Sequence, residues 1–314
     1  MEVPFSIASL RFHSILRRSF RSFSTFSEGH DTLTGEMTKL DSRTFDDWLE
    51  GQRPFDPKDP KLDLRGYGFI TPAALVQLSA LVYSLARPRV RPVVELDDDG
   101  VLSYLARAGF CATISPVAET WPRVNEAMYR QYRGSNPMLL EVTRIESCAA
   151  LPKLLDKILV VLNQHLKYPK FDAYDIATVI SEVTQNTFDH NCTTHGFLAM
   201  QVYGTRERFL EIGIADHGHG LTETLKRNPR NGSITSDSEA IKVATRLGTS
   251  EYDDQTRGTG LYHLVETTYK HQGLVQIRSG EAKVRYRMDR KQGWMFAVPE
   301  MSGVQIALNL PAKN

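Results

Sequence analysis

Ile212-Gly-Ile-Ala-Asp-His-Gly-His-Gly-Leu221 is the most informative segment of the chain: an apolar strand ends in an aspartate, and glycines then alternate with other residues. The carboxylate of Asp216, at the end of a buried strand, can accept a hydrogen bond from an exocyclic amine. Gly218 and Gly220 have no Cβ, so a flat base can lie against their backbone. A glycine-rich turn after a strand is the simpler alternative, and this segment alone leaves both interpretations open.

Further upstream, the sequence predicts a helix from about residue 172 to residue 189. Glu182, Asn186 and His190 follow one another at intervals of four, so they lie on nearly the same helical face. A solvent-exposed polar stripe gives the same spacing, and a carboxylate–amide pair at this interval stabilises a helix by only about 0.2–0.5 kcal/mol. The adjacent face is apolar, with Ile176, Val179, Ile180 and Val183.

Downstream, Arg257-Gly-Thr-Gly-Leu-Tyr262 places Gly258 and Gly260 before another amphipathic helix. Free N–H groups and the helix dipole make such a helix start suitable for phosphate. The spacing fits neither the P-loop, which needs Gly-Lys-Ser/Thr, nor the Rossmann pattern, which needs a third glycine.

In this order, the three segments resemble the nucleotide-binding boxes of the Bergerat-fold ATPases, the superfamily of gyrase, histidine kinases and mismatch-repair ATPases. Ser181-Glu-Val-Thr-Gln-Asn-Thr-Phe-Asp-His190 resembles the N-box, residues 216–220 the first glycine box and residues 258–261 the second. The resemblance covers about residues 139–311 and is closest in style to the anti-sigma-factor serine kinases. It implies an α/β sandwich in which helices cover a mixed sheet.

The resemblance also implies the chemistry of the helix at 172–189. Glu182 would be the catalytic base that polarises an attacking water or hydroxyl. Asn186 would hold Mg²⁺ through its side-chain oxygen, with phosphates and waters completing the octahedron. His190 would orient the N-box or cap the end of the helix.

For the nucleotide, the resemblance implies that Asp216 receives the adenine amine and that residues 222–257 form a flexible lid over the phosphates. One departure concerns the last box, where the family commonly has Gly-Thr and this chain has Gly303 followed by Val304. That puts a hydroxyl contact near the adenine in doubt. The glycines expected at the nucleotide are Gly218, Gly220, Gly258 and Gly260.

The first half of the chain predicts a smaller α/β unit. A strand at Lys61–Leu64 precedes a turn at Arg65–Gly68 and a helix in which Thr71 is the N-cap and Pro72 the first residue. Together with residues 93–110, this stretch resembles the STAS fold of anti-sigma-factor antagonists, which are phosphorylated on a serine at the start of the helix. The equivalent position here is Ala73, so this half lacks that phospho-acceptor.

Length and turn signals predict two domains in the 314 residues. Pro116, Pro122, Gly134 and Pro137 mark the boundary, giving an STAS-like α/β domain at 37–135 and a histidine-kinase-like ATP-binding domain at 139–314. Residues 1–36 stand outside both, because residues 3–27 contain arginine, serine and phenylalanine but no acid. That composition is typical of a mitochondrial transit peptide, and an unstructured extension or a true start at Met37 explains it more simply.

Composition limits the classes of function. Thirty-eight basic against 37 acidic residues give a net charge of +1, which argues against a protein that coats nucleic acid. No apolar run reaches 18 residues, so we expect no membrane span. Three cysteines are too few for a disulfide scaffold and favour a reducing compartment. We therefore expect the cytoplasm, or the mitochondrion if residues 1–36 are a transit peptide.

Together these features predict a regulatory protein that binds ATP and Mg²⁺, either a slow ATPase or a serine/threonine kinase of the partner-switching type. The alternative is a non-catalytic, nucleotide-gated module for protein interaction. We expect a protein partner, and the sequence leaves open whether the chain forms a homodimer. His217 and His219 beside the first glycine box are expected to be exposed.

Overall fold

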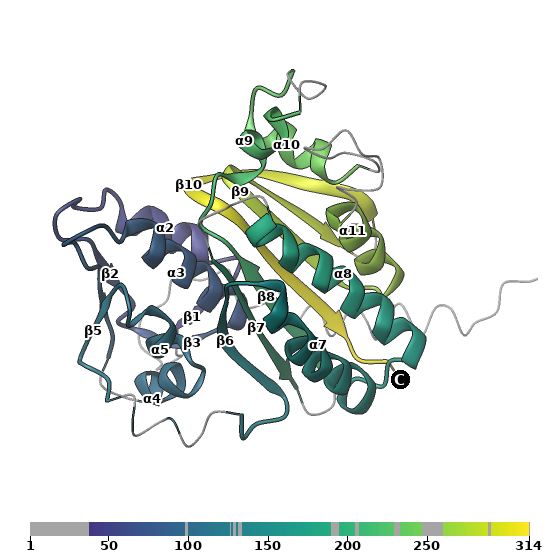
Figure 1. The fold of residues 1–314 in the computed structure, drawn as a ribbon, viewed down its shortest axis with the longest axis horizontal. Coiled ribbons are helices and arrows are strands. Elements are labelled where there is room, and N and C mark those ends of the chain that lie inside the picture. Colours follow the sequence, from purple (N-terminus) through teal and green to yellow (C-terminus); the bar gives the residue numbers. More distant parts are fainter. Residues whose placement is uncertain are drawn as a thin grey trace, which may run out of the picture. The chain divides into compact units, whose positions relative to one another are not determined.

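The computed structural model describes residues 38–97, 100–125, 127, 130, 134–189, 195–204, 207–228, 233–246, 260–287 and 290–313. All of them belong to one compact unit, Met37–Asn314. The fold is of the α/β class, with helices packed on several sheets (Figure 1). None of the described helices is long and apolar enough to cross a bilayer.

The main sheet consists of β6 (Leu139–Ile145), β7 (Gly196–Tyr203), β8 (Phe209–Ala215), β9 (Leu274–Arg287) and β10 (Arg290–Pro311). Its strand order is β6-β7-β8-β10-β9, and all four pairings are antiparallel. The prediction that this sheet mixes parallel and antiparallel strands is therefore wrong. Short connections join β7 to β8 and β9 to β10, and short connections link only antiparallel neighbours.

The sequence predicts separate strands at 274–278, 283–287, 293–297 and 304–310, whereas the structure joins the first two in β9 and the last two in β10. Their pairing continues through register shifts between Ala297 and Met301 and between Met301 and Val304. Gly280 and Gly303 adopt positive φ values of 57° and 82° in the irregular part of this ladder. The glycines bend the strands without ending the pairing.

Three long helices cover one face of the main sheet (Figure 1). The apolar sides of these helices share a hydrophobic core with Leu210, Ile212 and Ile214 of β8. The amphipathic pattern of residues 151–166 predicts one helix, and in the structure this segment is α-helical to Val160 and continues as a π-helical turn, Val161–His165. The three helices are α7 (Leu151–Val160), α8 (Lys170–Asp189) and α11 (Gly260–Lys270).

Helix α3 (Pro72–Leu85) packs on β7, β8 and β10. As predicted, the Thr71 side chain caps it by accepting a hydrogen bond from Ala74 N–H at 3.5 Å. The helix approaches the backbone of β8 so closely that a Cβ on Gly213 would lie 2.7 Å from the Cα of Ala73. Ala73 N–H also donates to the buried carboxylate of Glu211 at 3.1 Å.

The rest of the first half forms two small parallel sheets and short helices. Strand β5 (Glu119–Trp121) lies within the segment that the sequence predicts as the boundary between domains. Strand β3 (Tyr67–Ile70) begins at Tyr67, so the turn expected at Arg65–Gly68 is shorter than predicted. The strands are β1 (Thr38–Leu40) paired with β3 (Tyr67–Ile70), and β2 (Lys61–Asp63), β4 (Val93–Glu95) and β5 (Glu119–Trp121) in the order β2-β4-β5. The helices are α2 (Phe45–Gln52), α4 (Gly100–Arg107) and α5 (Phe110–Ile114).

A second hydrophobic core joins the two halves of the chain. Phe197, Ala199 and Ala215 of the main sheet belong to the same buried cluster as the apolar residues of α2, α3, α4 and α5. The division into domains at 37–135 and 139–314 stays a prediction.

Candidate functional site

Asp216 follows β8 directly, on the side of the sheet that α8 covers. Side chains alternate between the two faces along a strand. Ile212 and Ile214 pack in the core with α8, whereas Ala215 packs in the core with α3. The same alternation assigns the Asp216 side chain to the α8 face and His217 to the α3 face, where its ring lies 5.6 Å from that of Tyr83.

The C-terminal part of α8 reaches the same end of the sheet. A Cβ on Gly196 would lie 2.0 Å from Thr187 Oγ1, so the last turns of α8 touch the start of β7. Phe197, the next residue of β7, pairs with Ala215, the residue before Asp216. The predicted N-box and the first glycine box therefore lie at one end of the main sheet.

The carboxylate of Asp216 accepts hydrogen bonds from two backbone N–H groups. Gly218 N–H donates to Oδ1 at 2.8 Å, and Val304 N–H donates to Oδ2 at 3.3 Å. In a regular antiparallel pair the second donor would bind the backbone carbonyl, because Asp216 N–H already donates to Val304 O at 3.0 Å. Instead, Gln305 Nε2 donates to the Asp216 carbonyl oxygen at 3.3 Å.

Burial raises the pKa of the Asp216 carboxyl to about 7, and the two backbone donors offset only part of this effect. The residue is 3% exposed. Because desolvation disfavours the charged form, a carboxylate held here favours a hydrogen-bond donor as its neighbour. A pKa so far from its usual range is also typical of functional sites.

One glycine borders Asp216, and a second lies beside the first. Gly303, with a φ of 82°, has no space for a side chain, because a Cβ there would lie 2.2 Å from the carbonyl oxygen of Asp216 and 2.6 Å from its Oδ1. Gly220, with a φ of 78°, lies close to the Ser279 hydroxyl, which accepts a hydrogen bond from Leu221 N–H at 2.9 Å. Both positions require glycine for conformation and for space.

Glu182 and Asn186 of α8 face the first residue of α11. A Cβ on Gly260 would lie 3.4 Å from Asn186 Nδ2 and 3.4 Å from Glu182 Cβ. Glu182 Oε2 is buried and accepts no hydrogen bond among the described residues, although His263 Nδ1 approaches it to 3.5 Å. The structure thus brings together three of the predicted site residues, one carboxylate, one amide and one glycine, at the start of a helix.

Of the segment expected as a lid, the structure describes residues 222–228 and 233–246, and both parts contain helix. The segment contains most of α9 (Gly220–Lys226) and all of α10 (Asp237–Ala244), which lie beyond the end of the sheet near β9 and β10 (Figure 1). Ser236 caps α10, and Glu281 N–H of β9 donates to Asp237 Oδ2 at 2.9 Å. His190 and Gly258 lie outside the described residues.

The expectation that His217 is exposed is wrong. Its ring packs against Tyr83 and Phe197, and its Nε2 is buried without a hydrogen-bond partner among the described residues. Burial lowers the pKa of His217 to about 4, with a smaller contribution from His195. His219, by contrast, is exposed, as expected, and pairs with Glu223 at 3.0 Å.

Three residues beside the site are absent from the sequence predictions: Ser279, Gln305 and His263. Their roles depend on strands and helices that meet only in the folded chain, so no local pattern marks Ser279 or Gln305. His263 has a local signal, since it comes one helical turn after Gly260. Among the described residues, no group of three or more His, Cys, Asp or Glu side chains could hold a metal ion alone.

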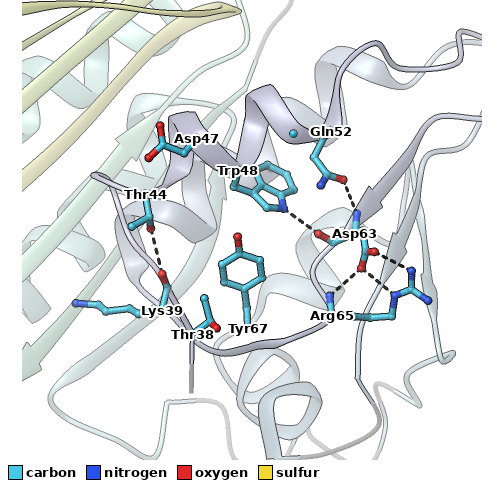
Figure 2. A pocket seen from close by; sticks show the side chains of 10 residues that line it. Thr38, Lys39, Thr44, Asp47, Trp48, Gln52, Asp63, Arg65 and Tyr67 are labelled. Atoms are coloured by element: carbon cyan, nitrogen blue, oxygen red, sulfur yellow. Dashed lines mark hydrogen bonds and ion pairs between the residues drawn. The ribbon is translucent and has the colours of Figure 1, made fainter. Parts of the chain in front are cut away.

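A separate pocket of about 470 Å³ lies at α2, β1, β2 and β3 (Figure 2). Several of its lining groups already bind one another: Trp48 Nε1 donates to Asp63 O at 2.8 Å, and Arg65 pairs with the Asp63 carboxylate at 2.7 Å. Gln52 Oε1 accepts from Asp63 N–H at 2.8 Å. None of the predicted nucleotide-site residues lines this pocket.

Comparison with models of known protein families gives no match for this chain, and comparison with curated protein sequences gives none either.

Proposed function

We propose that this chain is a regulatory protein that binds ATP and Mg²⁺ between the end of β8, the C-terminal part of α8 and the start of α11. The buried carboxylate of Asp216 carries the proposal. Burying a carboxylate is costly unless donors pair with it. In this protein the Asp216 carboxylate is buried where two glycines, Gly220 and Gly303, keep the backbone free of side chains, and its pKa is raised to about 7.

Asp216 supplies selectivity for the base. Its carboxylate accepts a hydrogen bond from the adenine amine, which adds a donor to the two backbone N–H groups already bound. Guanine presents a carbonyl at the equivalent position, so two acceptors would face each other. An unpaired buried polar group costs about 1–3 kcal/mol.

Glu182 and Asn186 supply the reactive part of the site. The buried Oε2 of Glu182 lacks a hydrogen-bond donor among the described residues, which suits a group that accepts a proton from an attacking water or hydroxyl. Asn186, one helical turn further along α8, would hold Mg²⁺ through its side-chain oxygen. Mg²⁺ would neutralise phosphate charge, and the N-terminus of α11 beside both residues adds N–H donors for phosphate.

The proposed activity is slow ATP hydrolysis or phosphoryl transfer to a protein. Glu182 favours an enzyme over a nucleotide-gated binding module, because binding alone requires no carboxylate at this position. The start of α3 supports a regulatory role in which the first half of the chain stays docked on the main sheet, because Ala73 N–H at this helix start already donates to the Glu211 carboxylate of β8. A phosphate at the same helix start would meet that buried carboxylate.

Calorimetric titration with Mg-ATP and Mg-GTP tests the proposal. The wild type should prefer ATP by roughly ten- to hundred-fold, since about 1.4 kcal/mol corresponds to tenfold. Asp216→Asn should weaken the binding of ATP and narrow the preference for ATP over GTP, because an amide can donate to the guanine carbonyl. Glu211→Gln is the matched control, since Glu211 is a buried carboxylate of the same strand on the opposite face. Equal affinity of the wild type for both nucleotides would remove the main support for the proposal.

A further inference from the structure

A buried layer of polar side chains lies between α2 and the main sheet. Asp46 of α2 binds Arg278 of β9, with Arg278 Nε donating to Asp46 Oδ1 at 3.0 Å. Lys283 of β9 also donates to the Asp46 carboxylate. All three side chains are at most 10% exposed, so the bonds are shielded from solvent.

From Arg278 the hydrogen bonds continue to Asp216. Arg278 Nη1 donates to Gln305 Oε1 at 3.3 Å, and Gln305 Nε2 donates to the backbone carbonyl of Asp216 at 3.3 Å. Arg278 and Gln305 are each 1% exposed. A continuous chain of buried hydrogen bonds (Asp46, Arg278, Gln305 and Asp216) thus connects a helix of the first half to the carboxylate residue of the candidate site.

Gln305 Nε2 and Val304 N–H donate to different oxygens of Asp216. In the regular ladder Val304 N–H would donate to the Asp216 carbonyl. Here Gln305 Nε2, which also donates to Ser302 O at 2.7 Å, donates to that carbonyl, and Val304 N–H donates to the Asp216 carboxylate. A side chain of β10 thus holds the backbone of Asp216 at the point where the ladder departs from its regular pattern.

We propose that Gln305, Arg278 and Asp46 are positioning residues for Asp216, so that base selectivity depends on the docking of α2 against the sheet. The inference rests on the proposed nucleotide site and extends it to residues in the other half of the chain. Because coupling between binding and docking is reciprocal, ATP should in turn stabilise the docked α2.

Of two similar buried glutamines, Gln305 is hydrogen-bonded to Asp216, whereas Gln276 is hydrogen-bonded to Ser42. Gln276 is buried in the same layer, and its Nε2 donates to Ser42 Oγ at 2.7 Å, close to Asp46 in sequence. No hydrogen bond connects Gln276 to Asp216 or to Gln305 among the described residues. Gln276→Leu is therefore a matched control for Gln305→Leu: both replace a buried amide with an apolar group of similar size.

Titration of the full chain with Mg-ATP and Mg-GTP compares the two variants. In Gln305→Leu, Val304 N–H can return to the Asp216 carbonyl, so ATP affinity should fall about three- to tenfold and the preference for ATP should narrow. Gln276→Leu should change both quantities less than about twofold, although both variants lose a buried hydrogen bond and thermal stability. Equal effects of the two variants on ATP affinity, or no effect of Gln305→Leu, would overturn the inference.

Asp46→Asn adds a second test from the α2 side of the chain. Asp46→Asn should lower the affinity for ATP. Asp47→Asn, at the adjacent exposed position, should leave this affinity unchanged. In the wild type, ATP should slow amide hydrogen exchange in α2, a protection that Gln305→Leu should reduce. If the wild type binds no ATP, the proposed function and this inference both fail. If it binds ATP selectively but α2 exchange is unchanged, only the inference fails.

Discussion

Burial raises the pKa of the Asp216 carboxyl in the folded chain from its ordinary value of 3.8 to about 7, because it disfavours the charged form. A carboxylate buried in this way lowers the stability of the unliganded protein at neutral pH and above. Binding of a donor such as an amine would restore part of that stability. In the proposed site, stability and recognition therefore act in opposite directions at this one residue.

The first prediction follows from the sign of this shift. Because the folded pKa is raised, the stabilising contribution of protonated Asp216 is complete below pH 3.8 and is lost as the pH rises through about 7. Relative to the wild type, Asp216→Asn should therefore become more stable as the pH increases from 5 to 8. Urea unfolding of both unliganded proteins at these pH values measures the difference, and parallel curves would contradict the raised pKa.

The second prediction separates binding from chemistry at α8. Glu182→Gln should keep ATP affinity within a few-fold and abolish turnover, because an amide cannot accept the proton. Asn186→Ala should weaken ATP binding only when Mg²⁺ is present. Incubation with γ-labelled ATP and a cell lysate measures turnover: label on a protein indicates a kinase, and free phosphate indicates an ATPase. Turnover by Glu182→Gln at the wild-type rate would remove the catalytic role.

At the scale of elements, helix α3 lies directly against strand β8. The Cα of Ala73, the carbonyl of Pro72 and the side chain of Val76 all lie within 2.8 Å of the Cβ position of Gly213. Glycine at this position lets the helix lie directly on the strand. The contact also places Ala73 N–H within reach of Glu211, so packing and hydrogen bonding depend on the same residue.

The third prediction tests this contact. Gly213→Ala should destabilise the protein by about 1–3 kcal/mol, because its methyl group would force α3 away from the sheet. Gly51→Ala is the control: no atom lies within 4 Å of its Cβ position in α2, so the change should stabilise by about 0.5–1 kcal/mol. Thermal unfolding of both variants should show shifts of opposite sign. A neutral Gly213→Ala would indicate that α3 is less tightly packed.

At the scale of the molecule, all described residues belong to the unit Met37–Asn314. The two halves of this unit share a hydrophobic core and the buried hydrogen-bond chain from Asp46 to Asp216. A protein built in this way is expected to unfold as one cooperative unit, despite the turn-rich segment near residue 135.

The fourth prediction concerns residues 1–36. A chain that begins at Met37 should unfold at the same temperature as the full chain and bind ATP equally well, because residues 3–27 contain no acid and lack a periodic apolar pattern. Differential scanning calorimetry and titration of the two chains provide the comparison. A midpoint several degrees lower for the shorter chain would show that the segment packs on the rest of the protein.

Local pattern alone predicted much of the secondary structure. The alternating or apolar patterns of residues 139–145 and 209–215 predict two strands, and β6 (Leu139–Ile145) and β8 (Phe209–Ala215) have these bounds; Thr71 caps α3 as predicted. These features depend on side-chain alternation and on capping groups within a few residues of one another, which the sequence displays directly. The positions of Glu182, Asn186 and Asp216 relative to their own elements were predictable for the same reason.

The antiparallel order of the main sheet, the burial of His217 and the positioning of Asp216 by Gln305 became evident only from the tertiary structure. Each arises from residues far apart in the chain: Glu211 meets Ala73 across 138 positions, and Arg278 meets Asp46 across 232. Local propensity carries no information about such pairs, because their energies depend on burial and on geometry that exist only after the elements have packed.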